Sequence, residues 1–440
     1  MKVLMVCSEL APLAKTGGLA DAVTGLSNAL AARGHDVRVL LPRYSRLPPA
    51  PAKLRARRGG FTFAQLPSAG HAPRVYAVDL GALGDGGIYH GDERDAGRFL
   101  RLSLAVAPLC AALHWTPDVI HCHDWHAALV PLALAARGGE SPPSLLTLHN
   151  IAYQGIFAAG VLDQYGAAEL APKFPPDALS GDTVNFLRAG LRTADVVSTV
   201  SPTYAAEIRT AEFGMGLEGI LTERGDAVVG ILNGVDYDTW DPGVDPFIEA
   251  HYGADDLGPK AGLKAALAAR LGLDVANDAP LVGLVSRIVP QKGVDLVAAA
   301  LPTLLRETRA SFVLLGSGDA ATVAELRTLA STEPRRVSFT EGYDEALAHR
   351  IFAASDVFLV PSRYEPCGLT QMYALRYGTI PVVRATGGLA DTITHFDPSS
   401  GTGNGSVFRD ADVGGLLWGT RTALDWFDRP DVRSRLIRNA

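Results

Sequence analysis

Two basic residues flank a short turn in the second half of this 440-residue sequence. Arg287 and Lys292 follow the apolar run 281–285, and Gly293 comes directly after them. Open α/β sheets bind ligands beyond the carboxyl ends of their strands, so these cations are well placed. Two fixed cations can neutralise a diphosphate and stabilise the charge that develops on it as it leaves. The alternative interpretation is that both residues form surface ion pairs.

A carboxylate follows another apolar run, at 356–360, in the segment PSRYEPCGLTQ (361–371). Glu365 in this segment could stabilise an oxocarbenium-like sugar or orient a sugar hydroxyl. The backbone amides of 368–370, at the start of the next predicted helix, could face phosphate oxygens. Alternatively, Glu365 only complements the dipole of that helix, and chemistry alone does not separate the two interpretations.

The hexapeptide TGGLAD occurs at 16–21 and again at 386–391, and Lys15 precedes the first copy. Paired glycines that lead into a helix offer bare backbone amides at its positive end, which suits phosphate or sugar oxygens. The alternative is that each Gly-Gly pair only makes a tight turn. Because the copies lie in opposite halves, a cleft between two domains could use both.

Histidines are concentrated in the first half. His149 ends the apolar run 144–148 and could donate a hydrogen bond to a sugar hydroxyl, or serve a structural role. The segment HCHDWH (121–126) suggests a metal site, but no second ligand group with zinc or iron spacing is near it. We favour Asp124 as a helix N-cap and Trp125 as a packing or sugar-stacking ring.

Strand-length apolar runs alternate with helix-length segments in two series. Runs in the first series are 3–7, 37–41, 118–122, 144–149, 195–200 and 227–231, with helices near 19–30 and 125–136. Runs in the second are 281–285, 311–315, 336–339, 356–360 and 380–383. The pattern predicts an α/β protein with two Rossmann-like, doubly wound domains built on parallel sheets, residues 1–240 and 241–440, facing a central cleft. The connection is the Asn-, Asp-, Gly- and Pro-rich segment 233–246.

Composition argues against several classes of protein. The formal net charge is −7, and the only basic cluster, 53–58, is interpreted as a solvated loop, so no nucleic-acid partner is expected. The apolar run 3–7 is too short for a signal peptide or membrane span, which predicts a cytoplasmic protein without a membrane partner. The four cysteines are scattered, and 316–321 (GSGDAA) matches a dinucleotide-binding pattern only weakly.

Together, these motifs resemble those of the bacterial and plant glycogen and starch synthases, which are retaining glycosyltransferases of the two-Rossmann-domain type called glycosyltransferase-B. The resemblance rests on seven segments in family order: 15–21, 121–126, 149–155, 233–236, 286–293, 361–371 and 386–391. It implies transfer of glucose from an ADP-glucose donor to the non-reducing 4-hydroxyl of an α-1,4-glucan acceptor. It implies no metal and no organic cofactor.

The resemblance also implies roles for individual residues. The donor phosphate would contact Lys15, Gly17 and Gly18. Arg287 and Lys292 would hold the diphosphate, Glu365 would stabilise the reacting sugar, and His149 would bind its hydroxyl. Glu9, Asp21, Asp124 and Asn233 would line the cleft. Substrate would also contact the turn made by Cys367, Gly368, Leu369 and Thr370, and Tyr343 would stack on the nucleotide base.

Two features depart from related transferases. Many carry a second Glu eight residues after the first, where this sequence has Tyr373, so a two-carboxylate scheme has no support. The family usually continues into an aromatic C-terminal segment that packs across the first domain. This sequence stops at 438–440, and we expect residues from about 420 to cross back toward the first domain.

Three alternatives remain open. One is a transferase of the same architecture that uses UDP-glucose or another acceptor. Another is a glucan phosphorylase, which would need a lysine for pyridoxal phosphate among Lys260, Lys264 and Lys292. The third is a non-catalytic glucan-binding protein, against which the joint presence of Lys15, Arg287, Lys292 and Glu365 argues.

Overall fold

The computed structural model describes residues 1–48, 55–67, 72–276 and 278–440. The chain divides into two compact units, Met1–Gly234 (unit 1) and Val235–Ala440 (unit 2). This division lies inside the predicted connection 233–246. Part of the basic cluster, 53–54, lies outside the described residues, and its remainder forms strand β3 (Arg55–Arg58). Among the described residues, no helix is long and apolar enough to cross a membrane.

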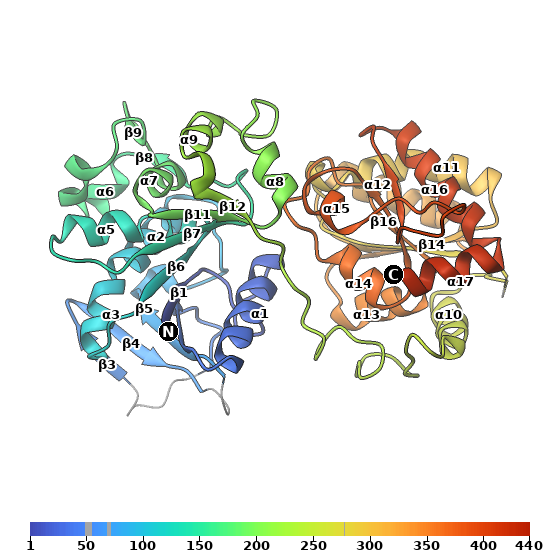
Figure 1. Cartoon of the computed structure of the whole chain (residues 1–440), viewed down its shortest axis with the longest axis horizontal. Helices are drawn as coiled ribbons and strands as arrows, with labels where there is room; N and C mark the ends of the chain where they lie inside the picture. The colour runs from blue at the N-terminus through green and yellow to red at the C-terminus, as the bar shows by residue number, and fades with distance from the viewer. Residues whose placement is uncertain (49–54, 68–71, 277) are drawn as a thin grey trace. The chain divides into compact units, whose positions relative to one another are not determined.

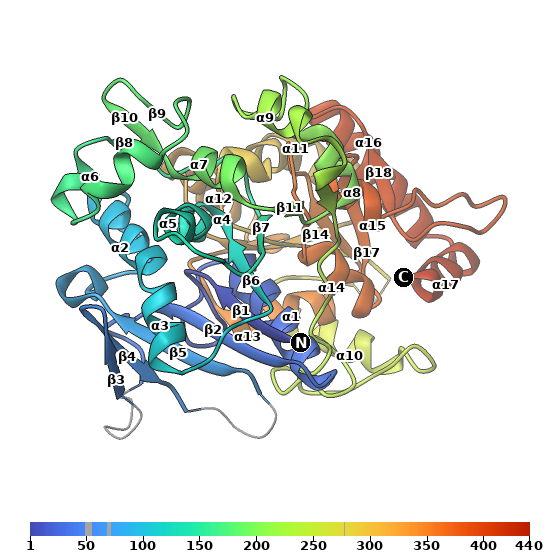
Figure 2. The same cartoon turned by 60° about the vertical axis from the view of Figure 1, so that its left-hand side comes forward.

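Unit 1 is built on a nine-stranded sheet with the order β12-β11-β7-β6-β1-β2-β5-β4-β3. Its other strands are β1 (Lys2–Val6), β2 (Asp36–Pro42), β4 (Phe61–Gln65), β5 (Arg74–Asp79), β6 (Val119–His123), β7 (Ser144–Leu148), β11 (Val196–Thr199) and β12 (Val228–Gly230). A separate small sheet, β8-β10-β9, consists of β8 (Ile156–Ala158), β9 (Leu179–Ser180) and β10 (Thr183–Asn185). Figure 2 shows this small sheet beside α6 (Val161–Gln164) and α7 (Phe186–Thr193).

The remaining helices of unit 1 connect these strands. They are α1 (Gly18–Ala32), α2 (Glu93–Leu104), α3 (Val106–Ala112), α4 (Asp124–Ala127), α5 (Val130–Ala136), α8 (Pro202–Glu207) and α9 (Glu218–Glu223). Short 3-10 turns form at η2 (Gly81–Gly84), η3 (Ala168–Lys173) and η4 (Gly225–Ala227).

Helices cover both faces of the unit 1 sheet because its strands are apolar on both sides. Alternate residues of β1 enter different cores: Leu4 and Val6 pack with α2 and α5, whereas Val3 and Met5 pack with α1. β1 pairs in parallel with β2 on one side and β6 on the other. This arrangement confirms the predicted doubly wound α/β architecture for the centre of the sheet.

Two details of unit 1 differ from the prediction. The sheet is mixed, because β4 pairs antiparallel with both β3 and β5. β3 is charged and β4 alternates, so neither contains the kind of apolar run on which the prediction relied, whereas β5 contains the apolar run 75–78, which the prediction did not include. The helix predicted at 125–136 is two helices, α4 and α5. Pro131 has no backbone N–H to donate to the preceding turn, which explains the interruption.

Unit 2 contains a six-stranded parallel sheet with the order β15-β14-β13-β16-β17-β18. Its strands are β13 (Leu281–Val285), β14 (Ser311–Gly316), β15 (Val337–Glu341), β16 (Val357–Val360), β17 (Ile380–Arg384) and β18 (Ser406–Phe408). Its helices are α10 (Gly258–Leu271), α11 (Val294–Glu307), α12 (Ala320–Thr332), α13 (Glu345–Ala354), α14 (Thr370–Arg376), α15 (Gly387–Thr392), α16 (Val413–Phe427) and α17 (Pro430–Asn439), with a 3-10 turn at η5 (Pro290–Lys292).

The unit 2 sheet is also covered on both faces. Phe312 and Leu314 of β14 pack with α11 and α16, while Val313 and Leu315 enter a core with α10 and α13. Figure 1 shows these two groups of helices on either side of the strands. The last helix, α17, contributes Leu436 to the core of unit 2. Within unit 2, the segment from about 420 therefore packs on the α16 side of the sheet.

The order of strands creates a switch point in each unit. From β13 the chain moves outward to β14 and β15, then returns to β16 on the other side and continues to β17. β13 and β16 are therefore neighbours, and the chain leaves β13 toward one edge of the sheet and β16 toward the other. In unit 1, β1 and β6 have the same relationship. Such points are where open α/β sheets bind ligands.

Gly293 allows the two loops of the unit 2 switch point to meet. Its φ is +63°, and an added Cβ would lie 2.2 Å from the carbonyl oxygen of Pro361. Gly293→Ala should lower the free energy of unfolding by more than about 1 kcal/mol, because both the conformation and the contact oppose a side chain. Gly262→Ala in α10 is the control, since its added Cβ meets nothing within 4 Å. Denaturant unfolding measures both, and equal stabilities would contradict the packing described.

Candidate functional site

An ion pair joins the two loops at the unit 2 switch point. Lys292 Nζ lies 2.5 Å from Glu365 Oε2, and Ser362 Oγ donates to the same oxygen at 2.8 Å. Glu365 is only 4% exposed. A buried carboxylate is costly unless it is paired and hydrogen-bonded, and here both conditions are met. The structure thus brings together two residues that the sequence analysis selected separately.

Further contacts hold the Glu365 loop in place. Arg363 forms a two-pronged ion pair with Asp295 of α11, with nitrogen–oxygen distances of 2.8 and 2.6 Å. The amide of Gly388, in the second TGGLAD copy, donates to the backbone carbonyl of Glu365 at 3.0 Å. A Cβ on Gly388 would lie 2.2 Å from the carbonyl oxygen of Cys367, so this position requires glycine. The second Gly-Gly pair therefore packs on the Glu365 loop, and the expectation of bare amides in this copy is wrong for Gly388.

The turn after Glu365 is fixed by one buried amide side chain. Gln371 Nε2 donates to the carbonyl oxygens of Cys367 and Gly368, at 3.1 and 2.9 Å. Gly368 has a φ of +74°. Leu369 and Thr370 follow at the start of α14, and both are half-buried. Cys367, Gly368, Leu369 and Thr370 thus form one ordered turn beside Glu365.

Two predicted residues of unit 2 are exposed. Arg287 follows β13, and no side-chain hydrogen bond or ion pair of Arg287 is found within the described ranges. Tyr343 follows β15 and is 72% exposed. β14 lies between β13 and β15 in the sheet, so Tyr343 leaves an edge strand, two strands from the one that leads to Arg287.

In unit 1, Glu9 organises the loop after β1. Glu9 Oε2 accepts hydrogen bonds from the amides of Thr16 and Gly17, at 2.6 and 3.1 Å. Its other oxygen accepts from Tyr89 Oη at 2.5 Å. The expectation of bare amides in the first TGGLAD copy is therefore wrong for Gly17, because the buried carboxylate needs donors and takes this one. Gly18 begins α1 and is exposed.

Lys15 and Asp21 form an ion pair across the start of α1. Their nitrogen–oxygen distance is 2.8 Å, and the side chains are 24% and 25% exposed. Asn233, also predicted, is half-buried near the end of unit 1. Within unit 1 the structure therefore groups Glu9, Lys15 and Asp21 with the first Gly-Gly pair.

Asp124 links the loops after β6 and β7. Its Oδ1 accepts from the amides of His149 and Asn150, at 2.6 and 3.3 Å. The prediction that Asp124 is a helix N-cap is wrong, since its carboxylate bonds the neighbouring loop and the residue adopts a φ of +56°. Burial raises the pKa of this carboxyl to about 7, although the two amides oppose the shift.

Four imidazoles lie in the same part of unit 1: two in β6, one in α4 and one in the loop after β7. His123 Nδ1 lies 3.0 Å from His149 Nε2, and the rings of His121 and His123 are 4.1 Å apart. Burial lowers the pKa of His121 to about 4 and of His149 to about 3, and it holds those of His123 and His126 well below the usual value. All four are therefore neutral near pH 7. In the part of the chain that the structure describes, no group of His, Cys, Asp or Glu has an arrangement suited to a metal ion.

Trp125 is a packing residue. It is 8% exposed and makes an edge contact with Phe99, with ring centroids 5.0 Å apart. A Cβ on Gly155, which has a φ of +64°, would lie 2.3 Å from the Trp125 ring. The segment 149–155 is thereby seated on this indole ring.

Tyr373, eight residues after Glu365, belongs to a buried aromatic stack. Its ring lies parallel to Trp240, with centroids 3.9 Å apart, and the other face of the indole stacks on His349 at 3.8 Å. Tyr373 therefore helps to pack Trp240, which belongs to the connection 233–246, against the core of unit 2.

The lysines that the phosphorylase alternative requires have other partners. Lys260 Nζ donates to the carbonyl oxygens of Ala353 and Tyr377 and to Thr379 Oγ1, all within 3.0 Å. Lys264 pairs with Asp356 at 3.0 Å, and Lys292 pairs with Glu365. The amino group of each lysine thus forms hydrogen bonds or an ion pair with oxygens of unit 2.

Sequence reasoning missed three residues at these loops: Ser362, Ser8 and Tyr89. Ser362 lies inside the motif 361–371, so its proximity to Glu365 was a usable signal. Tyr89 Oη contacts both Glu9 and Ser8 Oγ, the latter at 2.9 Å, from 80 residues along the chain. No local pattern marks such a contact.

Comparison with known proteins places these features in a family. A family model described as the starch synthase catalytic domain matches residues 2–223, and one described as glycosyl transferases group 1 matches residues 270–440. The chain is 45% identical to a glycogen synthase of Anaeromyxobacter dehalogenans (strain 2CP-1), covering 97% of this chain and 92% of that protein. It is 42% identical to the glycogen synthase of Paramagnetospirillum magneticum, covering 100% and 93%.

Solved structures are also similar to this chain. The catalytic domain of starch synthase IV from Arabidopsis thaliana, bound to ADP and acarbose, has a TM-score of 0.90 at 36% identity and covers 99% of this chain and 94% of its own. A sucrose-phosphate synthase from Thermosynechococcus elongatus, at 20% identity with a TM-score of 0.64 over 99% and 94% of the two chains, shows the fold alone.

We predict that acid destabilises this protein through its neutral imidazoles. The unfolded chain binds protons at these histidines below about pH 6.5, whereas the folded protein resists them until lower pH, so the free energy of unfolding falls on acidification. The raised pKa of Asp124 has the opposite effect, because acid favours the folded protein at this group, but it is one group and the imidazoles are four. The melting temperature should therefore drop between pH 7.5 and pH 4.5 at constant ionic strength; an unchanged value would contradict the burial of the four rings.

Asp124→Asn isolates the buried carboxyl. Because the folded pKa of Asp124 is raised, the unfolded chain alone loses this proton as pH rises from about 4 to 7, and stability is lost across that range. Asn keeps an acceptor oxygen and tolerates the positive φ. The variant should melt a few degrees above the parent at pH 8 and gain less at pH 4.5. Asp163→Asn, at an exposed carboxylate of α6, is the control and should show no such pH dependence.

Proposed function

This chain belongs to the glycogen and starch synthase family, and we propose that it transfers glucose from ADP-glucose to the non-reducing 4-hydroxyl of an α-1,4-glucan. In this reaction the bond between the glucose C1 and the diphosphate oxygen breaks, a bond from C1 to the acceptor oxygen forms, and ADP leaves together with the proton of the acceptor hydroxyl. The observation that carries the proposal is the Lys292–Glu365 pair at the switch point of unit 2. The related starch synthase that binds ADP supports an ADP-linked donor.

The unit 2 loops suit a leaving diphosphate. Lys292 is held beside Glu365, and Arg287 is exposed on the same loop, so both cations lie on the loop after β13. Preorganised charge that faces the developing negative charge lowers the barrier of such a step. Glu365 would stabilise the positive charge that develops at C1, and Tyr343 would stack on the adenine.

The unit 1 loops supply mainly neutral or internally paired groups. His149 is uncharged near pH 7, so it can hydrogen-bond a sugar hydroxyl without adding charge. The cation of Lys15 is shared with Asp21, and we propose that it contacts the donor phosphate. We assign Gly17, Gly18, Glu9, Asp124 and Asn233 to the shape of this surface.

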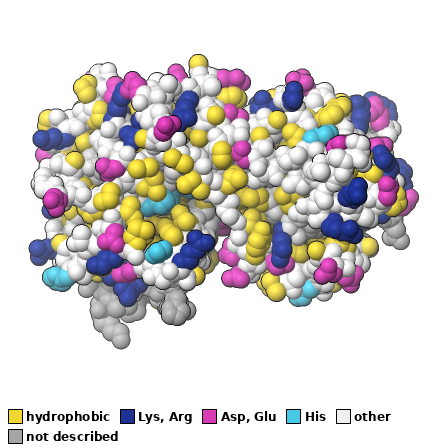
Figure 3. All heavy atoms as spheres, in the orientation of Figure 1, with side chains coloured by type: hydrophobic (Ala, Val, Ile, Leu, Met, Phe, Trp, Pro, Cys, Tyr) yellow, Lys and Arg dark blue, Asp and Glu magenta, His cyan; other side chains and the backbone are white. Residues whose placement is uncertain are grey.

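Stereochemistry and location complete the proposal. We propose that the α configuration is retained by attack from the face that the diphosphate leaves. Tyr373 stands where many relatives carry a second Glu and stacks on Trp240, so a two-carboxylate scheme has no support at this position. We also propose a cytoplasmic enzyme. The four free cysteines are consistent with a reducing compartment. On the face drawn in Figure 3, basic side chains are scattered among acidic ones, which is consistent with a neutral glucan as partner.

The decisive assay measures incorporation of labelled glucose from ADP-glucose into glycogen together with ADP release. UDP-glucose in competition tests donor choice, and a strong preference for it would redirect the proposal to the alternative donor. Absence of incorporation from either donor by the folded protein would defeat the proposal.

Glu365→Gln should lower kcat by about 10²-fold or more, because it removes charge at the reacting centre. Glu325→Gln, at an exposed carboxylate of α12, is the matched control and should retain parental activity. Comparable kcat values for the two variants would exclude Glu365 from the chemical step.

Tyr343→Ala should raise KM for ADP-glucose about fivefold with little change in kcat, because stacking contributes about 1 kcal/mol to binding. Tyr343→Phe keeps the ring and should behave as the parent. If both variants have the parental KM, the nucleotide base lies elsewhere.

A further inference from the structure

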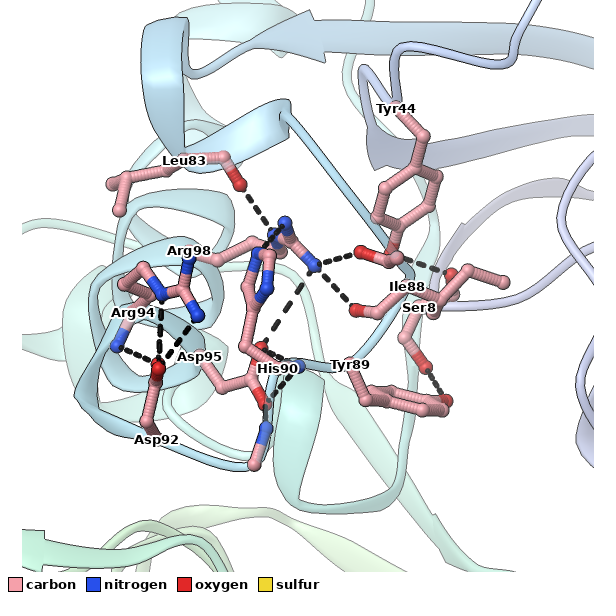
Figure 4. Close-up of polar contacts among 12 residues, drawn as sticks. Ser8, Tyr44, Leu83, Ile88, Tyr89, His90, Asp92, Arg94, Asp95 and Arg98 are labelled. Atoms are coloured by element: carbon pink, nitrogen blue, oxygen red, sulfur yellow. Dashed lines mark hydrogen bonds and ion pairs between the residues drawn. The ribbon is translucent and has the colours of Figure 1, made fainter.

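A fully buried arginine lies behind the unit 1 site. Arg98 of α2 has no exposed surface, and its guanidinium is surrounded by one segment of chain, residues 83–90. Arg98 Nε donates to the carbonyl oxygen of Leu83 at 2.5 Å, and Nη2 donates to that of Asp85 at 3.1 Å. Nη1 donates to the carbonyl oxygens of Gly87, at 2.8 Å, and Ile88. Figure 4 shows the guanidinium between this segment and Tyr44.

Two side chains complete the arrangement around Arg98. Nη2 lies 2.7 Å from His90 Nε2, and the carboxylate of Asp95 lies 3.8 Å from Nη1. Asp95 also accepts hydrogen bonds from the amides of His90 and Gly91. A planar guanidinium presents five N–H donors in a rigid fork, so one residue fixes several backbone carbonyls at once.

The middle of the segment that Arg98 holds has little packing of its own. Residues 85–87 are exposed to solvent, and 84, 86 and 87 are all glycine. Gly86 has a φ of +79°, a conformation that glycine adopts without strain. The ends of the segment are held by other contacts, because the carbonyl of Gly84 accepts from the amide of Ser45 and Ile88 is only 2% exposed. Between them, the guanidinium binds the carbonyls of Asp85 and Gly87.

This segment leads directly to Tyr89, which reaches the predicted site. Tyr89 Oη donates to Glu9 Oε1 at 2.5 Å, and its ring stacks on His126 with centroids 5.0 Å apart. Glu9 in turn accepts the amides of Thr16 and Gly17. Arg98 is therefore connected to the loop that carries Lys15 by its hydrogen bonds to the 83–88 backbone, by the covalent chain from Ile88 to Tyr89, and by the hydrogen bonds of Tyr89 and Glu9.

We propose that Arg98 is a positioning residue for glucosyl transfer, acting through Tyr89 and Glu9 on the loop 15–18. Arg98 itself is buried and touches no substrate. Burying a cation to stabilise a fold alone brings little advantage over an apolar side chain, whereas several simultaneous carbonyl contacts define one geometry. The activity readouts below rest on the proposed function; the exchange readouts do not.

Arg98→Lys keeps the charge but replaces the fork with a single ammonium, which cannot reach the same carbonyls together. We expect kcat to fall about tenfold with KM for ADP-glucose within about threefold, as misplacement of a positioned group predicts. Hydrogen–deuterium exchange should accelerate in peptides covering 81–91 and also 9–18. Arg224→Lys is the matched control: Arg224 contacts the carbonyl oxygens of Leu191, Ala194 and Asp195, away from the site, and its variant should leave both peptides and kcat unchanged.

A double-mutant cycle with Tyr89→Phe tests the route. In the Tyr89→Phe background, Arg98→Lys should reduce kcat by less than about threefold, because the connection to Glu9 is already lost. If Arg98→Lys lowers kcat by the same factor in the Tyr89→Phe background as in the parent, the proposal is overturned. Parental exchange in the 9–18 peptide of Arg98→Lys would also overturn it.

His90→Ala decides the matter if Arg98→Lys does not fold, since it removes one contact of the guanidinium and keeps the buried cation. Faster exchange in both peptides supports the proposal, and parental exchange in 9–18 overturns it. If the parent protein incorporates no glucose, the proposed function fails while these exchange measurements still decide the role of Arg98.

Discussion

A buried carboxylate at a strand switch point is the interaction on which each unit depends. Glu365 and Glu9 are 4% and 3% exposed, and such groups are stable inside a protein only when their oxygens are paired. Glu365 is paired with Lys292 and Ser362, which lie on two different loops. Glu9 accepts two amides and a phenol. The requirement to satisfy these oxygens determines where the surrounding loops lie.

Glycines allow the loops to approach each other closely. Gly388 lies against the carbonyl of Cys367, and Gly293 lies against that of Pro361, at distances that leave no room for a Cβ. The two loops of unit 2 therefore form one layer above the ends of β13 and β16. The same layer presents Lys292 and Glu365 with little freedom, which reduces the reorganisation that a bound donor would require.

The two units differ in their electrostatics. Unit 2 presents a lysine–carboxylate ion pair and an exposed arginine, whereas β6, α4 and the loop after β7 in unit 1 contain four neutral imidazoles and a carboxyl with a pKa of about 7. Desolvation accounts for both kinds of shift, because it disfavours every charged form. Of these groups only His149 is more than slightly exposed, and a neutral imidazole is suited to a sugar hydroxyl, whereas cations are suited to phosphates. The difference is consistent with the division of roles that we propose.

The sequence by itself determined the α/β class, the two series of strands and the loops that carry Lys292, Glu365, Lys15 and His149. Apolar runs and glycine-rich turns are local features, and strand ends in a parallel sheet share one edge, so these positions followed from spacing. The charged edge strand β3 and the alternating strand β4 lack such runs and could not be predicted in this way.

Only the tertiary structure decided which groups meet. The Lys292–Glu365 pair joins residues 73 positions apart, and Tyr89 reaches Glu9 across 80 positions. Asp124, which local rules assign to a helix cap, instead bonds the loop after β7, and Arg98 showed no motif at all. Hydrogen bonds between loops depend on strand order and close approach, and neither is encoded within a short stretch of residues.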